Sequence, residues 1–169
     1  FPPERIICLT EETVETLYLL GEQDRIVGVT GYAVRPPIVR KERERVASFT
    51  SAKIDKIISL KPDLVLAFSD LQAEIAAELI KNGIAVMTYN QRDIAGILAM
   101  IRHLGATIGV RETAEEIASS YERRLMDLRN AKKAVARPQV YFEEWDSAMI
   151  TGIKWVSELI EIAGGGGCF

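Results

Sequence analysis

The chain has 169 residues, of which 48% are hydrophobic, and its formal net charge is −3 at pH 7. This length and apolar content suffice to bury the core of one domain or slightly more, which excludes a disordered or fibrous chain. The positive charges form no basic run, so nucleic acid is not an expected partner. No apolar stretch approaches the ~18–20 residues of a membrane-spanning helix, so the chain is not expected to be membrane-embedded.

The cysteines and the other reactive residues indicate no catalytic chemistry. Cys8 lies inside the apolar run Ile6–Leu9, where a thiol packs as a small hydrophobic group, so we expect an inert core residue. Cys168 follows four glycines and forms no Cys-x-x-Cys spacing with Cys8. The sequence has one histidine, no phosphate-binding glycine loop and no Gly-x-Ser-x-Gly motif. We therefore predict no catalytic residue, no metal site and no cofactor.

Short apolar runs alternate with helical patterns through the first 110 residues. The apolar runs predict strands at 6–9, 26–29, 64–68 and 84–89, and apolar residues at helical spacing predict helices at 14–20, 54–60, 75–80 and 94–108. The continuous run Leu64–Phe68 is typical of a strand that is covered on both faces. The stretch 32–46 is charged, carries two prolines and is predicted to be irregular. Strands that alternate with helices predict a parallel sheet with helices on both faces, an α/β fold.

One long helix is predicted after Gly109. From Glu112 to Ala136 there is no glycine or proline, and apolar residues repeat every three or four positions. At 1.5 Å per residue this helix would reach roughly 35 Å, enough to cross from one lobe to another. A strand at 139–143 and a helix at 155–162 then begin a second α/β unit. We expect an N-terminal lobe at 1–110, a connecting helix at 111–136 and the start of a second lobe at 137–169, which is incomplete because its apolar faces lack cover.

Three stretches together resemble a known family. They are Arg5–Gly21 with Ile26–Thr30, then Ile57–Ala67 with its Leu-Lys-Pro-Asp-Leu-Val-Leu run, then Val156–Gly165. Their order and spacing are similar to the helix-linked periplasmic substrate-binding proteins of ABC importers, the class that serves vitamin B12, siderophores and haem. The resemblance implies two parallel-sheet lobes joined by one long helix, with a metal-chelate ligand, a corrinoid or an iron siderophore, bound between them. It also implies a permease and its ATPase as partners, and a periplasmic or other extracytoplasmic location.

The resemblance also implies which residues contact the ligand. In this family, as in open α/β sheets generally, the ligand lies at loops that leave the carboxyl ends of the strands. By position in such loops, the candidates for ligand contact are Tyr32, Phe49, Phe68, Glu143, Trp145 and Trp155. An aromatic face can stack on a flat macrocycle or chelate, although aromatic residues beside strands also belong to cores. Glu143 and Glu144 would alternate in direction along the predicted strand, so at most one of them faces the ligand.

Glu74, on the helix that follows Phe68, is a candidate of another kind. In the family an acidic residue near this position docks onto arginines of the transporter, and a carboxylate pairs bidentately with a guanidinium group. The rival interpretation is an ordinary solvated helix face.

Two other functions stay open for the chain: a cytoplasmic ligand sensor or scaffold with the same fold, and a chelatase-like or nitrogenase-component-like enzyme. The enzyme would need Cys or His ligands at strand ends, and the sequence offers none there.

Overall fold

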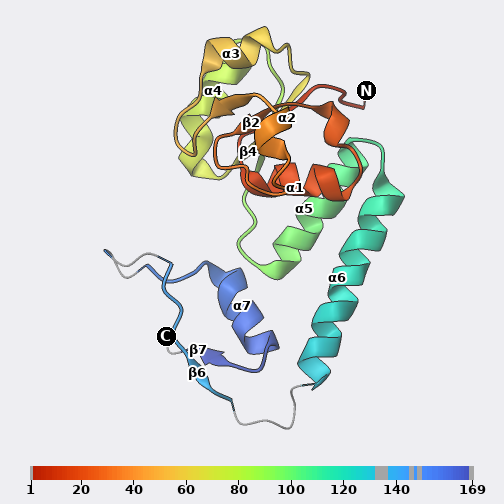
Figure 1. Ribbon diagram of the computed structural model, residues 1–169, viewed down its shortest axis with the longest axis vertical. Coiled ribbons are helices and arrows are strands. Elements are labelled where there is room, and N and C mark those ends of the chain that lie inside the picture. The colour runs from red at the N-terminus through yellow and green to blue at the C-terminus, as the bar shows by residue number, and fades with distance from the viewer. Residues whose placement is uncertain (1, 132–136, 145–146, 148–149, 168–169) are drawn as a thin grey trace. The chain divides into compact units, whose positions relative to one another are not determined.

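The computed structural model has two compact units, each with its own parallel sheet (Figure 1). The structure describes residues 2–131, 137–144, 147 and 150–167. The first unit is Phe1–Asn90 with Leu104–Arg111, and the second is Gln91–His103 with Glu112–Phe169. The predicted α/β fold class with parallel sheets is confirmed.

The first unit carries a five-stranded sheet in which all strands run parallel, in the order β3-β2-β1-β4-β5. The strands are β1 (Ile6–Cys8), β2 (Ile26–Thr30), β3 (Arg45–Ala47), β4 (Leu64–Phe68) and β5 (Val86–Tyr89). The helices are α1 (Glu11–Leu19), η1 (Gln23–Arg25), α2 (Val39–Glu42), α3 (Ile54–Ser59), η2 (Asp70–Gln72), α4 (Ala73–Lys81) and the last turn of α5 (Ile94–Thr107). Because the strand order reverses between β1 and β4, the carboxyl ends of these two strands form a switch point, where open α/β sheets bind ligands.

Helices cover both faces of this sheet (Figure 1). On one face Ile7 and Val65 pack with Ile57 of α3 and Leu79 of α4, and all four are fully buried. Successive residues of a strand point to opposite faces, so Cys8 belongs to the other face, where its thiol contacts Thr13 of α1. Burial raises the pKa of the Cys8 thiol to about 12. The prediction that Cys8 is a core residue is confirmed.

The described residues of the second unit form helices and two very short strands. Its elements are residues 94–103 of α5, α6 (Arg111–Ala131), β6 (Gln139–Val140), α7 (Lys154–Ile162) and β7 (Gly166–Gly167). α6 runs over 21 residues, whereas residues 132–136 of the predicted connecting helix lie outside the described residues. The expected lobe boundaries stay a prediction. None of the helices in the described ranges is long and apolar enough to cross a membrane.

Two segments differ from the sequence prediction. The stretch 32–46, predicted to be irregular, contains α2 and the first two residues of β3. β3 is an edge strand whose neighbour in the sheet is β2. Its three residues are too few to show a hydrophobic period. The strand predicted at 139–143 is wrong beyond Val140, because β6 has only two residues. Glu143 and Glu144 lie after the strand, so they do not alternate along it.

Candidate functional site

The loops that leave the carboxyl ends of the five parallel strands lie along one edge of the first unit. Backbone hydrogen bonds continue the strand pairing into these loops. The N–H of Gly31 donates to the carbonyl of Ala47 at 2.7 Å, and the N–H of Ser69 donates to the carbonyl of Tyr89, also at 2.7 Å. These hydrogen bonds extend the sheet by one residue at this edge, so they hold the first residues of the loops in place.

Gln72 is a buried amide that joins three of these loops. Gln72 is only 1% exposed. Its Nε2 donates to the carbonyls of Leu9 at 3.2 Å and of Phe49 at 2.9 Å, and its Oε1 accepts from the backbone N–H of Phe68 at 2.9 Å. One side chain thus ties together the loops after β1 and β3 and the end of β4, although two strands lie between β3 and β4 in the sheet.

The turn after β4 brings Gln72 into this position. Ser69 has a φ of 53°, a left-handed conformation that non-glycine residues adopt rarely. Its hydroxyl accepts from the N–H of Leu71 at 3.3 Å and caps η2. The chain therefore turns sharply at the end of β4, and Gln72 points back under the edge while Leu71 points to solvent, 55% exposed.

Aromatic and apolar side chains are exposed along the same edge. Tyr32, in the loop after β2, is 63% exposed, and Phe49, after β3, is 38% exposed. Phe68, the last residue of β4, is half-buried. Tyr32 and Phe49 are not core residues, so the core interpretation is wrong for these two. Large apolar groups gathered at a sheet edge are suited to cover by a ligand or a partner.

Glu11 holds the loop that carries Tyr32. Its carboxylate, in the first turn of α1, accepts from the backbone N–H groups of Val34 at 2.7 Å and Arg35 at 2.8 Å. The Arg35 guanidinium also lies 3.8 Å from the carboxylates of Glu11 and Glu15. The loop after β2 is therefore fixed by a charge-assisted pair of hydrogen bonds, which are stronger than neutral ones.

The residues of the second unit that are predicted to contact the ligand each bond to different neighbours. Glu143 is exposed and accepts from the Tyr141 hydroxyl at 2.7 Å, and this hydrogen bond raises the pKa of Tyr141. Trp155 lies in the first turn of α7, half-buried, and its backbone N–H donates to the carbonyl of Arg92 at 3.1 Å. Trp145 lies outside the described residues. Ligand contact by these residues, and by those of the first unit, stays a prediction.

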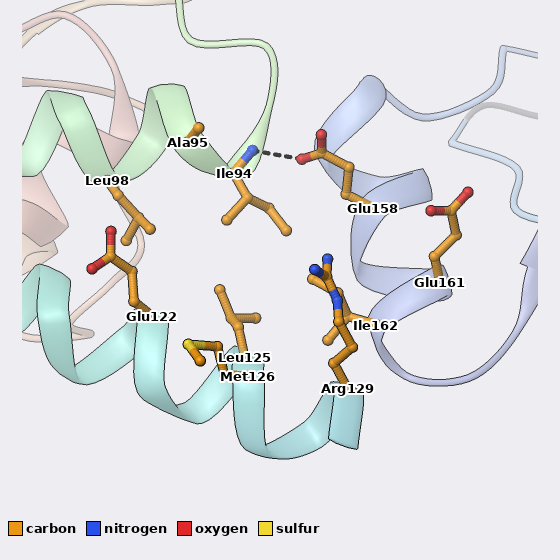
Figure 2. A pocket seen from close by; sticks show the side chains of 10 residues that line it. All are labelled: Ile94, Ala95, Leu98, Glu122, Leu125, Met126, Arg129, Glu158, Glu161 and Ile162. Carbon is orange, nitrogen blue, oxygen red and sulfur yellow. Dashed lines mark hydrogen bonds between the residues drawn. The ribbon is translucent and has the colours of Figure 1, made fainter. Parts of the chain in front are cut away.

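A cavity of about 500 Å³ lies within the second unit, between α5, α6 and α7 (Figure 2). It is lined by Ile94, Ala95, Leu98, Glu122, Leu125, Met126, Arg129, Glu158, Glu161 and Ile162. Figure 2 shows apolar side chains from all three helices directed toward one another, while Glu158 accepts from the Ile94 N–H at 2.8 Å. None of the five predicted ligand contacts that the structure describes is among these lining residues. The cavity therefore offers apolar walls, but two of its carboxylates, Glu122 and Glu158, already bind neighbouring groups.

Ion pairs connect the helices of the second unit. Arg102 of α5 binds Glu115 of α6 through Nε and Nη2, both at 2.9 Å, and Glu122 through Nη1 and Nη2, both at 3.0 Å. The hydrogen bonds from Arg102 lower the pKa of Glu115. Lys154 of α7 donates to Asp93, next to α5, at 2.8 Å. Within the described ranges, no group of three or more His, Cys, Asp or Glu residues is placed to hold a metal ion.

The model of the periplasmic binding protein family matches residues 6–169. The chain belongs to this family. A vitamin B12-binding protein of Vibrio cholerae is 31% identical over 169 residues, which are 98% of this chain and 60% of that protein. The uncharacterized ABC transporter substrate-binding lipoprotein YvrC of Bacillus subtilis is 30% identical over 141 residues, 81% of this chain and 44% of that protein.

The crystal structure of the periplasmic vitamin B12 binding protein BtuF of Vibrio cholerae is similar in fold, with a TM-score of 0.83 at 29% identity. The alignment covers 99% of this chain and 66% of that one. The chain therefore spans about 60% of the length of the curated V. cholerae relative and about two thirds of the solved chain. The resemblance to the periplasmic binding protein family, stated from the sequence, is confirmed.

Sequence reasoning missed Gln72. A glutamine in a first helical turn after a strand is usually solvated, and nothing in the pattern marks it as buried. In the structure the neighbouring Leu71 is 55% exposed while Gln72 is buried, a pairing that the sequence alone does not reveal. A buried amide beside an exposed leucine indicates that the hydrogen bonds of the amide hold the surrounding loops.

Proposed function

We propose that this chain is part of a substrate-binding protein that captures a metal-chelate ligand, a corrinoid or an iron siderophore, and delivers it to an ABC permease and its ATPase. Two relatives support this: one is named a vitamin B12-binding protein, and the other an ABC transporter substrate-binding lipoprotein. The observation that carries the proposal is the exposure of Tyr32, Phe49 and Leu71 along the carboxyl edge of a doubly wound sheet. Such side chains suit the flat apolar faces of a macrocycle or chelate.

In this proposal the ligand contacts are those named from the sequence. Tyr32, Phe49 and Phe68 bind from the first unit, and Glu143, Trp145 and Trp155 bind from the second. Binding is non-covalent, so the function needs neither a catalytic residue nor a cofactor of the protein's own. Both relatives carry names of binding proteins rather than enzymes, which supports a receptor. The family and the lipoprotein relative support an extracytoplasmic location.

Titration calorimetry tests ligand capture. The protein made from the complete gene is titrated with cobalamin, cobinamide, haem and a ferric siderophore, and we expect heat and a raised melting temperature with one of them. Phe49→Ala should then weaken that binding by about tenfold, the scale of losing one aromatic contact at a binding surface. Ile80→Ala on α4 is the control, because Ile80 is 59% exposed and lies outside the proposed site. No heat and no shift with any of the four ligands would exclude the proposal.

Glu74 is the proposed contact with the permease. It is exposed near the start of α4 and, among the described residues, forms no ion pair. A free carboxylate on a helix surface is available to an arginine of a partner. Glu74→Lys should leave the dissociation constant of the ligand unchanged and reduce uptake into vesicles that contain the permease and ATPase. Asp127→Lys, an exposed acid on α6, serves as the matched control. Equal uptake by both variants would remove Glu74 from the docking surface.

A further inference from the structure

One polar side chain, Gln72, is buried at the edge of the sheet where the strands have their carboxyl ends. The packing of helices on the sheet does not by itself require this burial. Gln72 is 1% exposed, whereas Leu71 beside it is 55% exposed. Burying an amide costs free energy unless its hydrogen bonds are made, and exposing a leucine forgoes the gain of burying it. Both residues lie opposite to their ordinary preference, so the position of Gln72 is set by what its amide binds.

The three hydrogen bonds of Gln72 need the chemistry of a primary amide. Its Nε2 donates to the carbonyls of Leu9 and Phe49 while its Oε1 accepts from the N–H of Phe68. A carboxylate of the same shape accepts but does not donate, and a protonated carboxyl donates only once. A methionine of similar length does neither as a normal hydrogen-bonding group. Among side chains of this length, glutamine alone serves all three backbone groups at once.

The loop that carries Phe49 is closed on itself and accepts a hydrogen bond from Gln72. Within the loop, the N–H of Ser48 donates to the carbonyl of Ser51 at 2.8 Å, and the N–H of Lys53 donates to the carbonyl of Val46, also at 2.8 Å. These bonds shape the loop between β3 and α3, and its Ala52 packs against the core cluster. The bond from Gln72 to the Phe49 carbonyl connects it to the loops after β1 and β4.

Phe49 and Phe68 are therefore held by the same side chain. The backbone of Phe49 accepts from Nε2 of Gln72, and the backbone of Phe68 donates to Oε1, both at 2.9 Å. We infer that Gln72 is a positioning residue, which fixes these two aromatic residues relative to each other before a ligand arrives. Pre-ordering of a binding loop reduces the entropy that binding would otherwise lose. The inference rests on the proposed function, because it assigns the rings to ligand contact.

The first test needs no ligand. Amide hydrogen exchange is compared in the wild type, in Gln72→Met and in Gln23→Met, which makes the same change in η1. We expect Gln72→Met to speed the exchange of the Phe68 amide and of residues 48–53 by about tenfold or more, since a buried backbone group loses its partner. Gln23→Met should leave these amides unchanged. Unchanged exchange of the same amides in Gln72→Met would overturn the inference.

The second test is a double-mutant cycle on ligand affinity, with the chelate that gives heat in the titration above. Gln72→Met should weaken binding by about tenfold in the wild type and by much less in a Phe49→Ala background, because the effect of Gln72 passes through Phe49. A merely structural role would give the same loss in both backgrounds, and that result overturns the inference while the proposed function stands. If the wild type binds no probe, the proposed function fails and the exchange experiment alone decides the role of Gln72.

Gln72→Glu keeps the test decisive if Gln72→Met does not fold. The glutamate has the same shape and still accepts from Phe68, but it serves at most one of the two carbonyls. Exchange should then rise in residues 48–53 while the Phe68 amide stays protected. Affinity should fall, and again only in the presence of Phe49. A uniform rise in exchange across the first unit would indicate general destabilisation and would contradict a positioning role.

Discussion

The carboxyl edge of the first unit and the helices of the second are held together in opposite ways. At the edge, the joining group is a neutral amide, Gln72, at 1% exposure. Between α5, α6 and α7 the joining groups are charged and partly open to water: the side chains of Arg102, Glu115 and Lys154 are 30%, 55% and 63% exposed. One region is tied by buried hydrogen bonds, and the other by surface ion pairs.

This difference has consequences for how each region responds to its surroundings. A buried backbone group that loses its partner costs roughly 1–3 kcal/mol, and salt does not screen that interaction appreciably. Exposed ion pairs contribute little each, and both salt and pH weaken them. The part of the edge that Gln72 holds, with Phe49 and Phe68, should therefore keep one conformation over a wide range of conditions, whereas the loop of Tyr32 also depends on the Glu11 carboxylate. The arrangement of the three helices should depend on those conditions.

The largest expected effect is a loss of stability from a substitution in the core of the first unit. Leu79 of α4 is fully buried in the cluster with Ile7 and Val65, so Leu79→Ala should lower the free energy of unfolding by about 2–5 kcal/mol. Ile80, the next residue, is 59% exposed, and Ile80→Ala should change it by no more than about 0.5 kcal/mol. Urea denaturation of both variants measures the contrast. Similar losses would mean that α4 does not pack on the sheet through Leu79.

A second effect tests how closely the sheet and α3 approach each other. A Cβ atom at Gly28 would lie 3.1 Å from Val46, 3.2 Å from Ile7 and 3.2 Å from Leu60, tighter than ordinary contact. Gly28→Ala should therefore destabilise the first unit by about 1–3 kcal/mol through overpacking. At Gly31 the nearest atom would be the Ala47 carbonyl oxygen at 3.4 Å, so Gly31→Ala is the control. Thermal denaturation that ranks Gly31→Ala as the worse change would refute this packing.

Much of the first unit could be predicted from the sequence because its strands and helices are long enough to show a period. Leu64–Phe68 is a strand with the predicted bounds, and α5 begins at Ile94 as expected. β3 was missed, since three residues at a sheet edge carry no periodic signal. The carboxyl edge as a site followed from the parallel strands and the family. Gln72 did not, because its burial results from the turn at Ser69 and from loops far away in the sequence.

A smaller effect separates the two regions by their response to salt. Arg102→Gln removes the bonds to Glu115 and Glu122 and should lower the melting temperature of the second unit slightly at low ionic strength. In about 1 M salt, where the Debye length is ~3 Å, the difference from wild type should nearly vanish. Gln72→Met should lower the melting temperature by the same amount at both salt concentrations. A salt-independent loss in Arg102→Gln would show that this side chain contributes by packing instead.

The smallest expected effect is a pH dependence confined to the second unit. The hydrogen bond from Lys154, with a further one from the Gly96 N–H, lowers the pKa of Asp93. A carboxyl whose pKa is lower in the folded state stabilises the fold above its unfolded pKa of about 4, and this stabilisation is lost as the pH falls through the folded pKa. The same pair raises the pKa of Lys154, so the lysine's contribution is lost only in strongly alkaline solution. In the acid range, Asp93 is therefore the titrating member of this pair.

Carboxyl NMR titration of Asp93 in the wild type and in Lys154→Met measures this effect. The midpoint should move up toward the ordinary value for aspartate when the lysine is removed, and an unchanged midpoint would assign the low pKa to Gly96 instead. Because the three bonds of Gln72 involve no titrating group, amides 154–158 of α7 should lose protection on acidification before amides 48–53 do. The reverse order would mean that the edge, and not the helix cluster, depends on charge.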